Sequence, residues 1–150
     1  MKATDLLKKQ HKEVKGLFKK VEKTEDARER KQLMEEITQA LEMHTRIEEE
    51  IFYPAVRGLE TQKAEEMVME AFEEHHVVKL VLKDLPNVDP EDERFEAKMT
   101  VLSELVEHHA DEEEKEMFKT AQRLGNEELE DLGEQMEARM GDAARGRRAA

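Results

Sequence analysis

Hydrophobic residues recur along most of this chain at intervals of three and four positions, which is the spacing of one face of an α-helix. The first stretch of this pattern predicts a helix that Thr4 caps and that ends in the polar segment 23–26. The second stretch runs from Leu33 through Pro54, which disturbs it, to an end near Gly58. The short connection between them favours an antiparallel pair.

The second half of the chain repeats this arrangement. A third helix is expected from about Thr61 to Leu85, where nearby prolines interrupt the pattern. Asp89 is expected to cap a fourth helix, with a proline at its first position, and this helix continues to a stop at Gly125. Two such helical hairpins predict an all-α, up-down-up-down four-helix bundle.

A short fifth helix is expected after the bundle. Asn126 can cap it, and it continues to about Met140. Residues 141–150 are small and basic with nothing to bury, so we expect them to be mobile. At 150 residues the chain has the size of one domain, which we place at 1–124, followed by the short helix and tail at 125–150.

Composition supports the helical fold and excludes several classes of function. Charged residues make up 42% of the chain and aromatic residues only 4%, while strong helix formers dominate. The net charge of −13 argues against a nucleic-acid partner, because phosphate binding needs a basic surface. No stretch approaches the ~20 apolar residues of a membrane span, and the first residues lack the apolar segment of a secretion signal. We therefore expect a cytoplasmic protein without membrane contact.

The chain contains no cysteine, so a bound metal ion would be held by imidazole and carboxylate groups. Each half carries the same pattern: one histidine in its first helix, and in its second helix a histidine followed four residues later by a glutamate. The segments HTRIEEEIFY and HADEEEKEMF, which lie 65 residues apart, align directly. The candidate metal ligands are His11, His44, Glu48, His75, His109 and Glu113.

The location of these six residues favours a metal site over a solvated charged face. All lie on apolar helix faces, where a carboxylate is costly unless it is paired or bound to a cation. Two equivalent ligand sets predict two ions, with both carboxylates bridging them. The adjacent His76 and His108 are turned about 100° away around their helices. His108 has polar neighbours, which indicates a surface position. His76 has an apolar stripe of its own, so between His75 and His76 the internal repeat is the reason for choosing His75 as the candidate ligand.

The ligand types point to a class of metal. Nitrogen and oxygen donors with open coordination positions suit redox-active iron, although donor type alone leaves zinc and manganese as alternatives. We expect two iron ions joined by an oxo or hydroxo bridge. The HExxH motif of zinc metalloproteases is absent from the sequence. Ferritin-like proteins, another class of di-iron bundle, use Glu-x-x-His pairs in an order that this chain lacks.

The order histidine, HxxxE, histidine, HxxxE resembles the hemerythrin-like domain family, also called the HHE cation-binding domain. The resemblance covers residues 1 to about 124 and extends to the segments TDLLKKQHK, HTRIEEEIFYP, EEH and EHHADEEE. It implies a non-heme di-iron bundle with the six ligands above. Oxygen carriers of this family are expected to have a fifth histidine, here replaced by Lys79, and an HxxxxD spacing in the last helix. The chain therefore resembles the dedicated oxygen carriers of the family less closely.

Two further residues are candidates for contact with the ligands. Ideal helical geometry turns Tyr53, five residues after Glu48, away from His44, so we expect it to pack at the bundle end. The alternative is a phenol beside or on one iron. Lys79 lies one turn from His75 and either donates to a bound small molecule or extends to water.

Four histidines would leave an exchangeable position on both irons, which favours a reactive or sensing site. The leading hypothesis is a protein that binds and reacts with dioxygen, hydrogen peroxide or nitric oxide, with catalase-like peroxide decomposition as a candidate activity. The alternative is an iron- or oxygen-sensing or iron-handling module that acts through a protein partner, whose identity the sequence leaves open.

Overall fold

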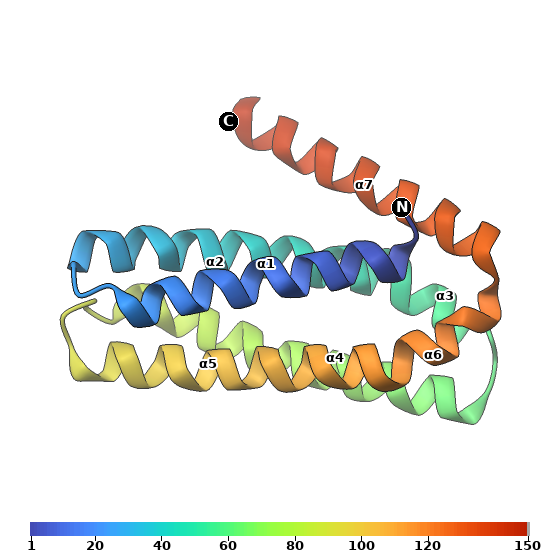
Figure 1. The fold of residues 1–150 in the computed structure, drawn as a ribbon, viewed down its shortest axis with the longest axis horizontal. Helices are drawn as coiled ribbons and strands as arrows, with labels where there is room; N and C mark the ends of the chain where they lie inside the picture. Colours follow the sequence, from blue (N-terminus) through green and yellow to red (C-terminus); the bar gives the residue numbers. More distant parts are fainter. Residues whose placement is uncertain (150) are drawn as a thin grey trace.

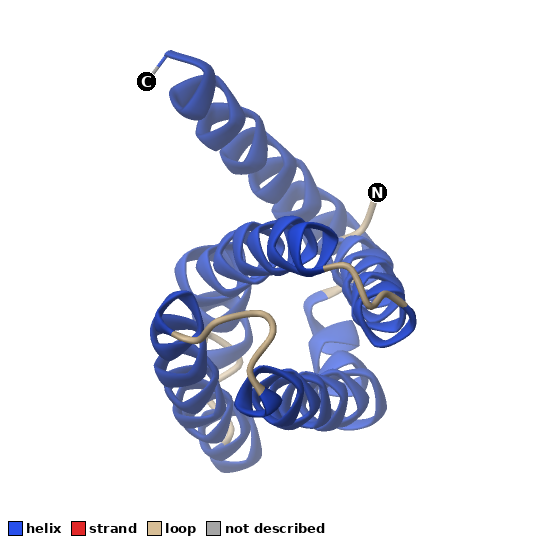
Figure 2. Cartoon of the chain, turned by 90° about the vertical axis from the view of Figure 1, so that its left-hand side faces the viewer, coloured by secondary structure: helices blue, strands red, loops and turns tan. Residues whose placement is uncertain are grey.

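The structure is a computed structural model that describes residues 1–149, and within this range it contains helices and no strand. Figure 1 shows the four longest bundle helices side by side. They are α1 (Ala3–Lys23), α2 (Ala27–Ile47), α4 (Gln62–Asp84) and α5 (Glu93–Glu112). Consecutive helices run in opposite directions, and the end-on view in Figure 2 shows them around a common interior. The predicted all-α, up-down-up-down bundle is confirmed.

Two of the bundle helices contain a π-helical turn that the hydrophobic pattern did not predict. Helix α2 continues through η1 (Glu48–Phe52) into α3 (Tyr53–Arg57), and α5 continues through η3 (Glu113–Met117) into α6 (Phe118–Ala121) and η4 (Gln122–Leu124). In both turns a backbone hydrogen bond spans five residues, from Tyr53 to Glu48 and from Phe118 to Glu113. The residue five positions after each glutamate is therefore brought back toward the same side of the helix.

Side chains cap three of the long helices. Asp26, Thr61 and Asp92 accept hydrogen bonds from the backbone amides of Arg28, Ala64 and Arg94, at 3.0, 3.1 and 3.0 Å. Each of these bonds satisfies an amide that has no partner within its own helix. The short turn η2 (Leu85–Asn87) ends α4 at the first proline of its connection to α5.

Three of the predicted caps are wrong, two of them in the bundle and the third, Asn126, at the start of the last helix. The N-cap of α1 is Lys2, and Thr4 is buried inside the first turn. The cap of α5 is Asp92, whereas Asp89 accepts a hydrogen bond from the amide of Glu91 in the preceding turn. Because the connection contains two aspartates that can each cap a helix, the sequence pattern alone does not choose between them.

Helix α7 (Asn126–Ala149) crosses the bundle next to α1. It buries Leu129, Leu132 and Met136 against the bundle end. The predicted fifth helix is thus present, but it is longer than expected, because the alanines and arginines after residue 140 favour helix. Figure 1 shows its last turns diverging from the bundle. The expected mobility of 141–150 stays a prediction, and residue 150 lies outside the described range.

Close packing joins α7 to the start of the chain. A side chain at Gly133 would place its Cβ 1.9 Å from the carbonyl oxygen of Met1, so only glycine fits there. Asn126 is the first residue of α7 and not its cap, and its side chain accepts a hydrogen bond from Lys2 at 3.0 Å. None of the helices within residues 1–149 is long and apolar enough to cross a bilayer.

The apolar core is divided into two clusters. One contains Leu7 and Phe52 and includes residues of α3, α6 and α7, and the other contains Phe18, Ile37 and Phe95 near the opposite end of the bundle. Buried histidines and glutamates lie between the two clusters along the helices. The fold therefore surrounds a polar layer with apolar packing on both sides.

Candidate metal centre

The structure brings all six candidate ligands together in the bundle interior, and each is at most 6% exposed. They form two groups that share Glu48, and within each group the ligand atoms lie within 4.8 Å of one another. The first group is His11, His44, Glu48 and Glu113, and the second is Glu48, His75 and His109. We call these six residues the centre. Its ligands come from all four long bundle helices or their π-helical continuations.

Each glutamate of the centre reaches histidines from both halves of the chain. The carboxylate of Glu48 lies 3.0 Å from Nε2 of His44 and 3.1 Å from Nε2 of His75. The carboxylate of Glu113 lies 3.3 Å from Nε2 of His109 and 3.1 Å from Nε2 of His11. Two carboxylates placed between two histidine pairs can bridge two metal ions.

Two buried atoms of the centre support a bound cation. Among the described residues, Nε2 of His44 and Oε2 of Glu48 have no hydrogen-bond partner. His44 Nε2 is close to Glu48 Oε1, but the two groups are not aligned for a hydrogen bond. A buried polar atom without a partner is costly, and a metal ion between these two residues would satisfy both. The residues present thus fit the metal that their chemistry implies.

The outer nitrogen of each of the four candidate histidines is held by a side chain that sequence reasoning missed. The Nδ1 atoms of His11, His44, His75 and His109 donate to Glu114, Gln10, Glu49 and Glu74, at 3.1, 2.7, 2.7 and 2.6 Å. These hydrogen bonds fix the ring orientation and leave Nε2 free to bind a metal. The sequence pattern predicted no role for these four partner residues. The repeat carried the missing signal, because these partners directly precede or follow a ligand in both halves.

Charges inside the centre shift its protonation in the metal-free chain. Burial lowers the pKa of His109, but the charges and hydrogen bonds of Glu113, Glu48 and Glu74 outweigh it, so this pKa lies well above its usual value. The pKa values of His11 and His75 are raised by the same balance of burial against nearby carboxylates. For Glu48, burial raises the pKa, but the His44 charge and several hydrogen bonds hold it well below its usual value. A binding cation therefore displaces protons.

Tyr53 packs in the apolar cluster at the bundle end, as expected, but its hydroxyl reaches the ligands, which was the alternative. Its hydroxyl donates to Glu113 at 2.5 Å and lies 3.1 Å from Nε2 of His75 and 3.2 Å from Nε2 of His109. The π turn causes this, because it turns the residue five positions after Glu48 back toward the interior. Burial and then the charges of Glu48 and Glu113 raise the Tyr53 pKa well above its usual value. The phenol therefore keeps its proton.

The structure places Lys79 outside the centre. Its side chain is 53% exposed, and its amine lies 2.9 Å and 3.0 Å from the two carboxylate oxygens of Glu49. Within the described part of the chain, Lys79 reaches His75 through Glu49 and not by a contact of its own. His76 and His108, which are adjacent in sequence to His75 and His109, also lie outside the centre. His76 is exposed, and the His108 side chain is 63% exposed.

A small cavity adjoins the histidines. Its volume is about 20 Å³, and it is lined by all four ligating histidines together with Gln10, Val14, Leu41, Thr45, Val78 and Val106. A water molecule needs roughly 10–15 Å³ by this kind of measure, so the cavity holds one very small molecule. Its walls are mostly apolar, which keeps bulk water away from the centre.

Comparisons with known proteins agree with this geometry. The family model described as Hemerythrin HHE cation binding domain matches residues 2–121. The uncharacterized protein Rv2633c of Mycobacterium tuberculosis is 34% identical over 143 residues, which are 93% of this chain and 86% of the relative. The crystal structure of an HHE cation-binding domain-containing protein from Mycobacterium kansasii, a Rv2633c homolog, superposes with a TM-score of 0.83 at 32% identity, covering 95% of this chain and 86% of that one. A Nostoc DNA nickase is 25% identical over 139 residues, covering 92% of this chain but 39% of the nickase.

Proposed function

The chain belongs to the hemerythrin HHE cation-binding domain family, and from this premise we propose that its centre holds two iron ions and reacts with a small oxidant or gas. The observation that carries the proposal is the position of Glu48 and Glu113, each between histidines of both halves. This arrangement suits two ions that share both carboxylates. His11 and His44 would complete one ligand set, and His75 and His109 the other.

Iron fits a redox role better than zinc, one of the two alternatives that donor type leaves open. The centre offers imidazole and carboxylate ligands without a thiolate, and four histidines with two shared carboxylates leave coordination positions free for an outside ligand. Two bound iron ions would supply redox chemistry and open positions for a small molecule. Zinc would supply no redox chemistry.

The residues around the centre restrict which molecules can react. The cavity of about 20 Å³ beside the histidines admits dioxygen, hydrogen peroxide or nitric oxide and excludes larger substrates. Tyr53 holds a proton at its hydroxyl, 2.5 Å from Glu113, where it can donate to a molecule bound at the centre. For hydrogen peroxide we propose disproportionation, in which two molecules of peroxide yield two of water and one of dioxygen.

The first experiment measures metal content. Protein purified from cells grown with iron should carry close to two iron atoms per chain, and the ferric form should absorb in the near-ultraviolet. His44→Ala and His109→Ala should each lower the iron content, while His76→Ala, in an exposed position, should not. One zinc per chain in place of iron would contradict the proposal.

The second experiment measures turnover. Diferric protein mixed with excess hydrogen peroxide should release dioxygen over many cycles. Bleaching after one equivalent would favour the alternative, an iron- or oxygen-sensing module that acts through a protein partner. One contact favours that alternative: Gln10, which holds His44, donates to the sulfur of Met140 on α7 at 3.4 Å. This contact links the centre to a helix outside the family match.

A further inference from the structure

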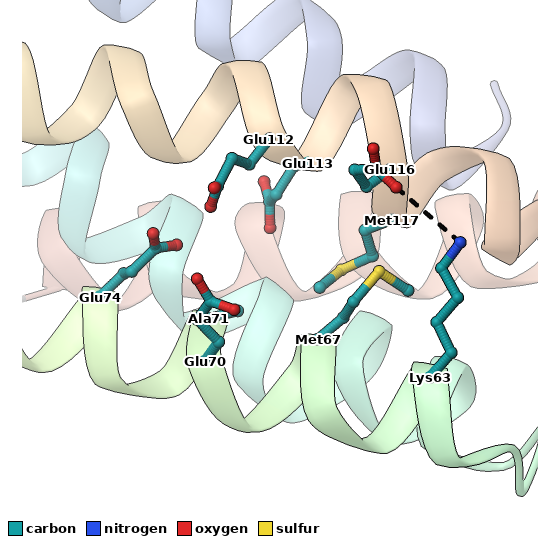
Figure 3. A pocket seen from close by; sticks show the side chains of 9 residues that line it. All are labelled: Lys63, Met67, Glu70, Ala71, Glu74, Glu112, Glu113, Glu116 and Met117. Carbon is teal, nitrogen blue, oxygen red and sulfur yellow. Dashed lines mark ion pairs between the residues drawn. The ribbon is translucent and has the colours of Figure 1, made fainter.

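A second cavity lies between α4 and the α5–η3 segment, on the side of the centre where Glu113 lies. Its volume is about 150 Å³, and Figure 3 shows the side chains that line it. Lys63 and Glu116 line its outer part and are 69% and 63% exposed, so it reaches solvent. Glu113, which is 3% exposed and a ligand of the centre, also lines it. The cavity thus leads from the surface to the centre.

The cavity lining combines charged residues that are mostly acidic with three apolar ones, Met67, Ala71 and Met117. Its walls carry five glutamates and one lysine, and the lysine, Lys63, lies 3.8 Å from Glu116. That pair neutralises one charge and leaves Glu70, Glu74 and Glu112 as further acidic residues of the lining beside the buried Glu113. A cleft lined by one sign of charge concentrates ions of the opposite sign and raises their rate of entry.

A cluster suited to a metal ion lies at the edge of this cavity. Nε2 of His108 lies 3.5 Å from Glu74 and 3.4 Å from Glu112, and one ligand atom from each residue fits within 4.8 Å. Figure 3 shows Glu74 and Glu112 directed toward each other from α4 and α5. The carboxylate of Glu74 also accepts the hydrogen bond from His109, so the cluster adjoins the centre directly.

Acidic clusters are common on protein surfaces, and the cavity behind this one distinguishes it. The cavity is lined by the buried carboxylate of Glu113, a member of the centre, whose unpartnered atoms Nε2 of His44 and Oε2 of Glu48 lie outside the cavity lining. The smaller cavity beside the histidines offers no carboxylate in its lining, and apolar walls penalise a hydrated cation. Of these two cavities, only the one lined by glutamates offers a cation a favourable path to the centre.

We propose that the acidic cavity is the path by which a divalent cation reaches the centre, and that Glu74, His108 and Glu112 form the surface site that captures it. The inference rests on the proposed function, because the path requires a metal centre at its end. One imidazole and two carboxylates bind first-row divalent ions such as ferrous iron. The ion then passes from Glu112 to Glu113, the next residue of the chain, while Tyr53 and the histidines stay in place.

The path is tested by the rate of metal uptake. Metal-free full-length protein is mixed with ferrous iron without oxygen, quenched with a chelator at set times and desalted, and retained iron is measured. The Glu70→Gln, Glu112→Gln double variant should load about tenfold more slowly, with a weaker dependence on salt, and should still reach the wild-type iron content. The control is Glu107→Gln, which removes a charge from an exposed position of α5 outside the cavity.

The capture site is tested at equilibrium. Cobalt(II) titrated into the iron-loaded protein should occupy one additional weak site per chain in wild type and in His76→Ala, and this site should be lost in His108→Ala. Wild-type loading rates in the double variant would overturn the path, and unchanged cobalt binding in His108→Ala would overturn the capture site. Wild-type protein that retains no iron would instead refute the proposed function together with the path.

Discussion

Tyr53 and Phe118 occupy equivalent positions after the two π turns, and the difference between them makes the two halves of the centre unequal. The Tyr53 hydroxyl lies beside His75 and His109, whereas the Phe118 ring stacks on His11 with ring centroids 6.1 Å apart. The hydrogen-bond partners of the histidines differ between the two halves as well. His109 donates to a carboxylate, that of Glu74, whereas His44 donates to the amide oxygen of Gln10. A carboxylate partner makes a ligating imidazole more basic. Two bound ions would therefore have different reactivity.

Replacing Tyr53 by phenylalanine removes the first of these two differences between the halves. Tyr53→Phe should keep the iron content near wild type, because the six ligands remain, and should lower peroxide turnover about a hundredfold if the phenol is the proton donor. Oxygen evolution and iron analysis measure the two effects. The matched control is Phe118→Tyr, which adds a hydroxyl at the equivalent position of the other half. Undiminished turnover in Tyr53→Phe would exclude the phenol from the reaction.

Glu49 and Lys79 allow a second test at this scale. Glu49→Gln removes the carboxylate that orients His75, so the affinity for iron should fall about 10- to 100-fold. Lys79→His should change iron affinity much less, because the lysine is exposed and contacts Glu49, not the ligands. Competition with a chelator of known affinity measures both. A new long-lived oxygen adduct in Lys79→His would show that position 79 does reach an ion.

At the scale of elements, the helices were predictable and their irregularities were not. Apolar stripes and prolines indicated the bundle because helical periodicity extends over 20 residues or more in each segment. The segments EEEIF and EEKEM, which form the π turns, carry no sequence signal that separates them from ordinary helix. The direction of the Tyr53 hydroxyl follows from such a turn, and for that reason the sequence pattern did not predict its contact with the ligands.

The centre itself was largely predictable from the repeat. Six ligands could be proposed because each half places the same residue types on an apolar face, and the structure brings those six together. Their outer partners were not predicted, since Glu49, Glu74 and Glu114 belong to acidic runs that look like solvated surface. In the structure each partner depends on a contact with another helix, which local patterning does not reveal.

Helix α7 offers a test of how closely it packs on the bundle. Gly133→Ala should lower the free energy of unfolding by about 1–3 kcal/mol, because the new Cβ would meet the Met1 carbonyl oxygen. Gly141→Ala is the control, since its Cβ would lie 3.5 Å from the nearest atom, in the flexible Arg145 side chain, and removing a helical glycine should stabilise slightly. Thermal denaturation followed by circular dichroism measures both. Equal melting temperatures would contradict the close contact.

For the whole molecule, metal removal should reduce stability. Ions that bind only the folded arrangement stabilise it by about 2.7 kcal/mol when the free metal is a hundred times its dissociation constant. For a chain of 150 residues this corresponds to a decrease in melting temperature on the order of 5–10 °C after chelation. Calorimetry of the iron-loaded and metal-free protein measures the difference. Identical melting temperatures would argue against a metal buried in the bundle.

The cavity beside the histidines gives the molecule a size filter. Its volume of about 20 Å³ lies between valines of α1, α4 and α5, and these helices are held apart at a fixed distance by the apolar clusters on both sides. An alkyl hydroperoxide is larger than hydrogen peroxide by at least a methyl group, and admitting it would require close-packed helices to separate. Selectivity among peroxides would then depend on the rigidity of the bundle and not on any polar group that recognises the reactant.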